Sequence, residues 1–102
     1  MKTITLSVEQ MQVNAAAAEQ LLKSLANANR LMVLCHLVSG EKTVGELERK
    51  LELSQSALSQ HLAKLRTQGI VDFRKEGTTA YYRITNPKAM EILQSLYDMY
   101  CS

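Results

Sequence analysis

The strongest constraint on the fold is a pair of short helical segments joined by only a few residues. Thr43 and Glu46 have the spacing of a capping box, which predicts a helix ending near Leu51. Ser54 can cap a second helix, and Gly69 can end it. In this second segment, leucines at helical spacing predict one buried face, formed by Leu58, Leu62 and Leu65.

A β-hairpin is predicted directly after this helix pair. Residues 70–75 and 79–84 are rich in β-branched and aromatic side chains and flank the turn Glu76-Gly77-Thr78. A helix, a short turn, a second helix and a two-stranded ribbon, in this order, indicate a winged helix-turn-helix. In such a unit the second helix enters the major groove of DNA, and the ribbon is called the wing.

The rest of the sequence predicts three more helices. They are expected at residues 9–25, from about residue 30 to the stop signal Ser39-Gly40, and from Asn86-Pro87 to about Tyr100. A chain of 102 residues has room for one core. We therefore expect a single, mainly α domain over residues 1–102, with five helices and a small β-hairpin. On the helix before Gly40, one apolar face is expected to contain Leu31, Leu34, Cys35 and Val38.

The second helix of the pair has an exposed face suited to DNA. At 100° per residue, the positions opposite Leu58 carry small or uncharged polar side chains. Gln60 can form two hydrogen bonds with adenine, and serine hydroxyls can donate to bases or phosphates. The free amides at the helix start suit a phosphate. The expected DNA contacts on this helix are Ser54, Gln55, Ser56, Ser59, Gln60, His61 and Lys64.

Positive charge is concentrated in the same part of the chain. The whole sequence carries a formal charge of only +2, but Ser54 to Arg83 contains five basic and two acidic residues. On the hairpin we expect Arg74, Lys75 and Arg83 to reach the DNA backbone or the minor groove. The alternative is a solvated hairpin whose charges only keep an edge strand soluble.

The chain resembles the ArsR/SmtB family of bacterial regulators. The resemblance extends from about Glu9 to Ser102 and is carried by Leu25-Ala26-Asn27-Ala28-Asn29-Arg30-Leu31, Val44-Gly45-Glu46-Leu47 and Leu53-Ser54-Gln55-Ser56-Ala57-Leu58-Ser59-Gln60-His61-Leu62. It implies a homodimer, built on the first and last helices, that represses operons until an inducer releases it. Two-fold symmetry then predicts a near-palindromic operator in double-stranded DNA, with half-sites about 34 Å apart or a multiple of that.

The last helix independently favours a dimer, because apolar residues cover more of its circumference than one small core can bury. The expected dimer interface contains Met11, Ala15, Ala18, Leu22, Met90, Leu93, Leu96, Tyr97 and Tyr100.

The sequence lacks the ligands with which many ArsR/SmtB members sense metals. No Cys lies in the segment Thr43 to Leu47, and no His lies in the last helix. We therefore expect no metal and no cofactor. Cys35 and Cys101 resemble instead the cysteine pair of the persulfide- and redox-responsive branch of the family. That resemblance implies that reactive sulfur species or oxidants link the two thiols and weaken operator binding. Cys35 can also be a small buried apolar residue, whereas a terminal Cys101 has no packing role to explain it.

Other functions remain open at this stage. They include a metal-responsive or constitutive regulator, an activator that displaces a silencing DNA-binding protein, and a protein-binding adaptor. An enzyme using Cys35 and His36 is disfavoured, because adjacent helical residues point about 100° apart. No apolar run reaches the roughly 18 residues of a membrane span, and the first residues lack a secretory signal, so we expect a cytoplasmic protein with no membrane partner.

Overall fold

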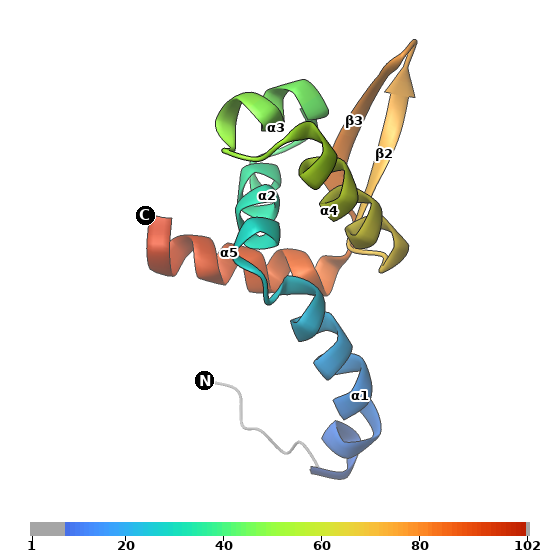
Figure 1. Cartoon of the computed structure of the whole chain (residues 1–102). Helices are drawn as coiled ribbons and strands as arrows, with labels where there is room; N and C mark the ends of the chain where they lie inside the picture. Colours follow the sequence, from blue (N-terminus) through green and yellow to red (C-terminus); the bar gives the residue numbers. More distant parts are fainter. Residues whose placement is uncertain (1–7, 102) are drawn as a thin grey trace.

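The computed structural model describes residues 8–101 and confirms the winged helix-turn-helix with five helices (Figure 1). In Figure 1 the hairpin projects from one end of the body, α5 crosses the other end, and α1 extends away from it. The elements, in chain order, are α1 (Val8–Leu25), α2 (Ala28–Val38), β1 (Lys42–Thr43), α3 (Val44–Lys50), α4 (Gln55–Thr67), β2 (Val71–Glu76), β3 (Thr79–Ile84) and α5 (Pro87–Cys101).

Strand β1 is the one element that the sequence did not predict. Its two residues pair antiparallel with β3, so the predicted hairpin becomes a three-stranded sheet in the order β1-β3-β2. Lys42 pairs with Tyr82 and Thr43 with Tyr81. A two-residue strand has no alternation of its own to detect, because period-two patterns need at least about four residues.

The predicted helix caps are present. The hydroxyl of Thr43 accepts from the amide of Glu46 at 3.1 Å, and the carboxylate of Glu46 accepts from the amide of Thr43 at 2.9 Å. Ser54 caps α4 through the amide of Ala57, and Asn86 caps α5. Gly69 follows α4 with a φ of +73°, the left-handed conformation that glycine tolerates best.

Removing the capping box of α3 should destabilise the domain. Thr43→Ala leaves the amide of Glu46 without its side-chain acceptor, and we expect the free energy of unfolding to fall by about 1 kcal/mol. Urea unfolding at fixed protein concentration measures the effect. Thr67→Ala is the matched control, because that exposed hydroxyl bonds only to Ala63 O of its own helix. Equal stability of Thr43→Ala and the wild type would contradict this prediction.

The core is almost entirely aliphatic. All five helices contribute buried residues to it, but α1 contributes only Leu25, at its end. Helix α2 lies against both α5 and β3. The predicted buried face of α2 needs correction for this reason. The side chains of Leu31, Cys35 and Val38 are only half-buried. Helix α2 is covered by α5 and by β3, and these two contacts bury a face other than the predicted one. The buried residues of α2 are Val33, Leu34 and Leu37.

Helix α1 contributes little to the core of its own chain. Of its eighteen residues only Ser24 and Leu25 are buried. The predicted interface residues Met11 and Leu22 are 58% and 57% exposed. On α5, Tyr97 and Tyr100 are also exposed. These apolar side chains therefore remain available to a second subunit.

Leu93 corrects the predicted interface. It is completely buried and belongs to the core of its own chain, so it offers no surface to a partner. Helical spacing placed it with the exposed apolar residues of α5 because apolar residues surround that helix on both sides. Among the described residues, no helix is both long and apolar enough to cross a membrane.

Candidate nucleic-acid interface

Helix α4 has the two faces that a reading helix needs. Its buried face rests on the core through Leu58, Leu62 and Leu65. On the outer face Ser56, Ser59 and Gln60 are exposed, and no hydrogen bond joins their side chains to another described residue. Their donors and acceptors are thus available to a ligand such as a base edge.

The other predicted contacts on α4 have more restricted side chains. The Ser54 hydroxyl accepts a hydrogen bond from the amide of Ala57, which uses one of its acceptor positions and leaves its O–H free to donate outward. His61 is half-buried at the side of the helix. Gln55 and Lys64 are exposed, and Lys64 forms no ion pair within residues 8–101. Lys64 is therefore suited to a phosphate beside the groove.

Arg66 joins α4 to the wing. Its Nε lies 3.1 Å from Asp72 Oδ1, and its guanidinium lies 4.4 Å from the centre of the Phe73 ring. The amide of Phe73 and the guanidinium of Arg66 hold the pKa of the Asp72 carboxyl below its usual value. Both groups of the ion pair are more than half exposed, so the contact orients the wing more than it stabilises the fold.

Of the three predicted cations on the wing, Arg74 has the most internal partners. Its guanidinium hydrogen-bonds Glu41 at 2.9–3.1 Å and Glu76 at 2.7 Å, and it lies 4.7 Å from the centre of the Tyr81 ring. These partners raise the pKa of Arg74, and the Arg74 hydrogen bond lowers the pKa of Glu41. Two carboxylates compensate the charge of Arg74, whereas neither Lys75 nor Arg83 forms an ion pair within residues 8–101.

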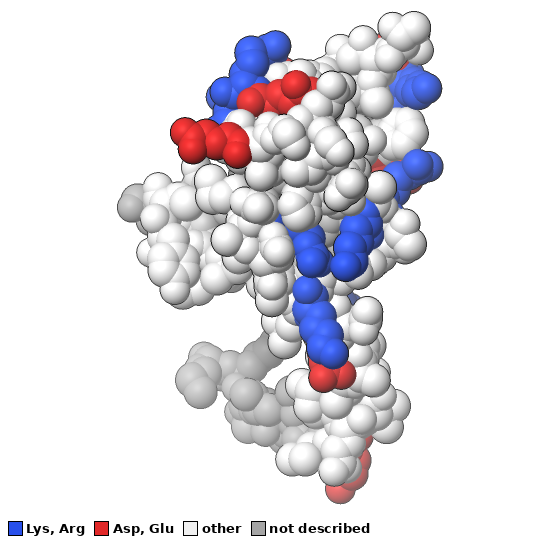
Figure 2. Space-filling view, viewed as in Figure 1, with Lys and Arg blue, Asp and Glu red and all other residues white. Residues whose placement is uncertain are grey.

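The charges on the molecular surface follow this arrangement. Figure 2 shows Lys and Arg over α4 and beside the projecting hairpin; over α3 basic and acidic side chains lie together, and an acidic group lies toward the outer end of α1. Between the basic groups the surface of α4 is uncharged. A polyanion would be attracted to the flanks, and the uncharged strip between them can contact bases.

The two cysteines, far apart in the sequence, lie at one pocket. Cys35 comes from the middle of α2 and Cys101 from the end of α5, and both thiols are free. Burial, and secondarily the nearby Cys101, raises the pKa of the Cys35 thiol, whereas Cys101 is exposed. We call this space, of about 300 Å³, the thiol pocket; it is lined by Met32, Cys35, His36, Ser39, Lys42, Lys50, Tyr97 and Cys101.

Metal coordination has little support in the structure. Within residues 8–101, no three side chains of His, Cys, Asp or Glu are close enough together to hold a metal ion. The thiol pocket has two cysteines and one histidine on its wall, but these do not form such a group. The sequence-based expectation of no metal is therefore retained as an expectation.

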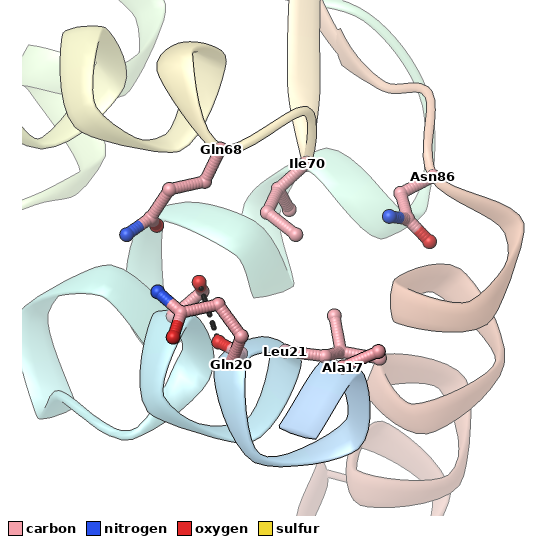
Figure 3. A pocket seen from close by; sticks show the side chains of 7 residues that line it. Ala17, Gln20, Leu21, Gln68, Ile70 and Asn86 are labelled. Carbon is pink, nitrogen blue, oxygen red and sulfur yellow. Dashed lines mark hydrogen bonds between the residues drawn. The ribbon is translucent and has the colours of Figure 1, made fainter. Parts of the chain in front are cut away.

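A second hollow, of about 450 Å³, separates α1 from the end of α4 (Figure 3). Gln20 of α1 and Gln68, the C-cap residue of α4, face this space. The side-chain oxygen of Gln68 is buried and has no hydrogen-bond partner among the described residues. The hollow shows that α1 is loosely packed against the DNA-reading part of its own chain.

The fold, the uncharged face of α4 and its basic flanks define a winged helix-turn-helix DNA-binding protein. Residues 27–72 match the family described as "Bacterial regulatory protein, arsR family". The chain is 45% identical, over 99% of its length, to the transcriptional activator HlyU of Vibrio cholerae, of which it covers 94%. The chain therefore belongs to the ArsR family of bacterial transcriptional regulators.

The chain is also similar to a repressor in sequence and to solved regulator structures in fold. The chain is 45% identical to the biofilm growth-associated repressor of Agrobacterium fabrum, over 90% of this chain and 79% of that protein. Reduced HlyU from Vibrio cholerae has a TM-score of 0.87 at 47% identity, covering 92% of this chain and 99% of the other. BigR from Xylella fastidiosa has a TM-score of 0.86 at 40% identity, covering 95% and 99%.

Proposed function

We propose that this regulator binds a near-palindromic operator as a homodimer and that linking Cys35 to Cys101 lowers its affinity for that operator. The observation that carries the proposal is the thiol pocket, whose wall includes both cysteines of the sequence. The Ser56, Ser59 and Gln60 side chains read bases, with Lys64, Lys75 and Arg83 on phosphates.

The dimer is supported by the faces that one chain leaves uncovered. Met11 and Leu22 on α1 and Tyr97 and Tyr100 on α5 are exposed apolar side chains. Helix α1 has almost no core of its own and needs another surface to cover it. A two-fold dimer built on these helices presents two α4 helices to successive turns of the same face of DNA.

The linking reaction follows from the different environments of the two thiols. Cys101 is exposed, and its thiolate attacks the outer sulfur of a persulfide RS–SH; the S–S bond breaks and RS⁻ leaves. The Cys35 thiolate, its proton lost to solvent, then attacks Cys101 Sγ and expels HS⁻. The two thiols are oxidised by two electrons to a disulfide, and the transferred sulfur is reduced to hydrogen sulfide. A link that retains extra sulfur atoms places a smaller demand on the distance between the cysteines.

The link would act by joining α2 to the end of α5. Helix α5 belongs to the proposed dimer interface, and α2 belongs to the body that holds α4. Joining them therefore changes the preferred spacing of the two α4 helices in the dimer. A coupling of about 1 to 3 kcal/mol between linking and DNA binding lowers affinity roughly 5- to 150-fold.

Gel shifts on the upstream region of the regulator's own gene test the proposal. Reduced protein, protein treated with glutathione persulfide and protein treated with zinc are compared, and mass spectrometry locates added sulfur. We expect the persulfide to weaken binding of the wild type and to leave Cys101→Ser bound. Unchanged binding after wild-type modification, or a full response of Cys101→Ser, would overturn the switch. A response to zinc alone would favour a metal-responsive regulator.

Activation by displacement is the second candidate, because one of the similar proteins is described as a transcriptional activator and another as a repressor. The same DNA-binding face serves both, so the structure is compatible with either direction of control. Transcription from the target promoter, measured with and without a DNA-coating silencer, separates them. A repressor lowers transcription from bare DNA, whereas a displacing activator raises transcription only when the silencer is present.

A further inference from the structure

The wall of the thiol pocket is positively charged. Lys42 comes from β1 and Lys50 from the end of α3, and neither Asp nor Glu is among the lining residues. The ammonium group of Lys42 lies 3.5 Å from Ser39 Oγ and 3.4 Å from the carbonyl of Glu41, both at the long end of the hydrogen-bond range. Four separate elements, α2, β1, α3 and α5, thus bring cationic or thiol groups to one space.

His36 lies on the same wall of the pocket as the two lysines. Its pKa is lowered first by burial and then by the charges of Lys50 and Lys42. Because the imidazole is neutral near pH 7, the positive charge of the pocket is carried by the lysines. The proposed reaction between two thiols and a sulfur donor uses neither lysine, so their presence requires another explanation.

We propose that Lys42 and Lys50 select an anionic sulfur donor for the thiol pocket. This inference rests on the proposed function and names the class of donor: a small molecule that carries sulfane sulfur together with negative charge. Two sources share this chemistry, namely persulfides of carboxylate-bearing thiols and inorganic polysulfide. The lysines hold the anionic part while its sulfane sulfur meets Cys101, and the anionic leaving group departs after the S–S bond breaks.

The thiol pocket has a volume of about 300 Å³ and is lined in part by the exposed Cys101 at the end of α5. This volume suits a small-molecule sulfur donor and excludes a protein-sized one. Tyr97 and Met32 form its apolar part. A neutral oxidant gains nothing from the lysines. Charge therefore distinguishes sulfur donors from neutral oxidants at the same pair of thiols.

The rate of thiol loss in reduced full-length protein tests this proposal. Glutathione persulfide, sodium tetrasulfide and the neutral oxidant diamide are each reacted with wild type, with Lys42→Gln/Lys50→Gln and with Lys64→Gln/Lys75→Gln. The last variant is the control, because it removes the same two charges from the DNA-binding side. Each pocket lysine should contribute about a three- to fivefold rate at low ionic strength, and the effect should shrink in salt.

We expect the pocket variant to react about tenfold more slowly with at least one anionic donor and at an unchanged rate with diamide. A loss with glutathione persulfide alone identifies the carboxylate-bearing source, and a loss with tetrasulfide alone identifies the inorganic one. Equal rates for the pocket variant and wild type, or equal losses in the control variant, would overturn the selection. If the rates differ but the modified wild type still binds its operator, the donor selection stands and the proposed switch fails.

Discussion

Gln60→Ala should lower affinity for the specific operator by about 30-fold or more. A bidentate contact between an amide side chain and adenine contributes about 1–3 kcal/mol of discrimination, and a dimer makes it twice. The side chain of Gln60 is exposed on α4 and forms no hydrogen bond with another described residue, so its removal leaves the fold intact. Fluorescence anisotropy with operator and random DNA of equal length, at one salt concentration, measures the difference.

Thr67→Ala is the control for this experiment. It lies on the same helix, but its hydroxyl donates to Ala63 O, and its removal should change neither affinity appreciably. If Gln60→Ala weakens operator and random DNA equally, Gln60 contacts the backbone and reads no base.

Converting the apolar stripe of α1 to an acidic one should separate the subunits. Met11→Asp/Leu22→Asp places charges on a face that is more than half exposed in one chain, so the single chain stays folded while a dimer would have to bury two carboxylates per subunit. Once the two α4 helices no longer belong to one dimer, operator affinity should fall by about 10²- to 10⁴-fold. Sedimentation velocity measures the assembly, and a gel shift measures the affinity.

The matched control carries an acidic residue on the other side of α1. Gln20→Asp changes an exposed position nearly opposite Leu22, next to the loosely packed hollow. It should leave the sedimentation coefficient unchanged. A Met11→Asp/Leu22→Asp protein that still sediments as a dimer, with native circular dichroism, would show that the subunits meet elsewhere.

Much of the fold could be predicted because local signals agree with the tertiary structure. The caps at Thr43, Ser54 and Asn86 and the leucines of α4 each depend on residues within one turn of each other. The stripe of α2 and the burial of Leu93 could not be predicted in this way. Both depend on which distant elements cover a helix. Helical spacing alone cannot distinguish an apolar face buried in the core of one chain from an apolar face that a second subunit would cover.

The candidate site was predictable to a different extent at each position. The exposed, unpaired state of Gln60 follows from its place opposite Leu58, which the 100° step gives directly. The ion pairs of Arg74 with Glu41 and of Arg66 with Asp72 bridge separate elements and have no signal in the local sequence. The same holds for Lys42 and Lys50, which only the folded chain places beside the two cysteines.

The shortest strand has two roles in this molecule. Lys42 of β1 forms part of the wall beside the cysteines, and its backbone pairs with Tyr82 in the middle of the wing. Just before it, Glu41 holds Arg74 of the opposite wing strand. A displacement of β1 by a molecule bound beside the thiols would therefore also shift the wing, because β1 pairs with β3 and Glu41 is bonded to Arg74 of β2. The β1–β3 pairing therefore gives a short structural connection between the thiol pocket and the strands that carry the proposed DNA contacts Lys75 and Arg83.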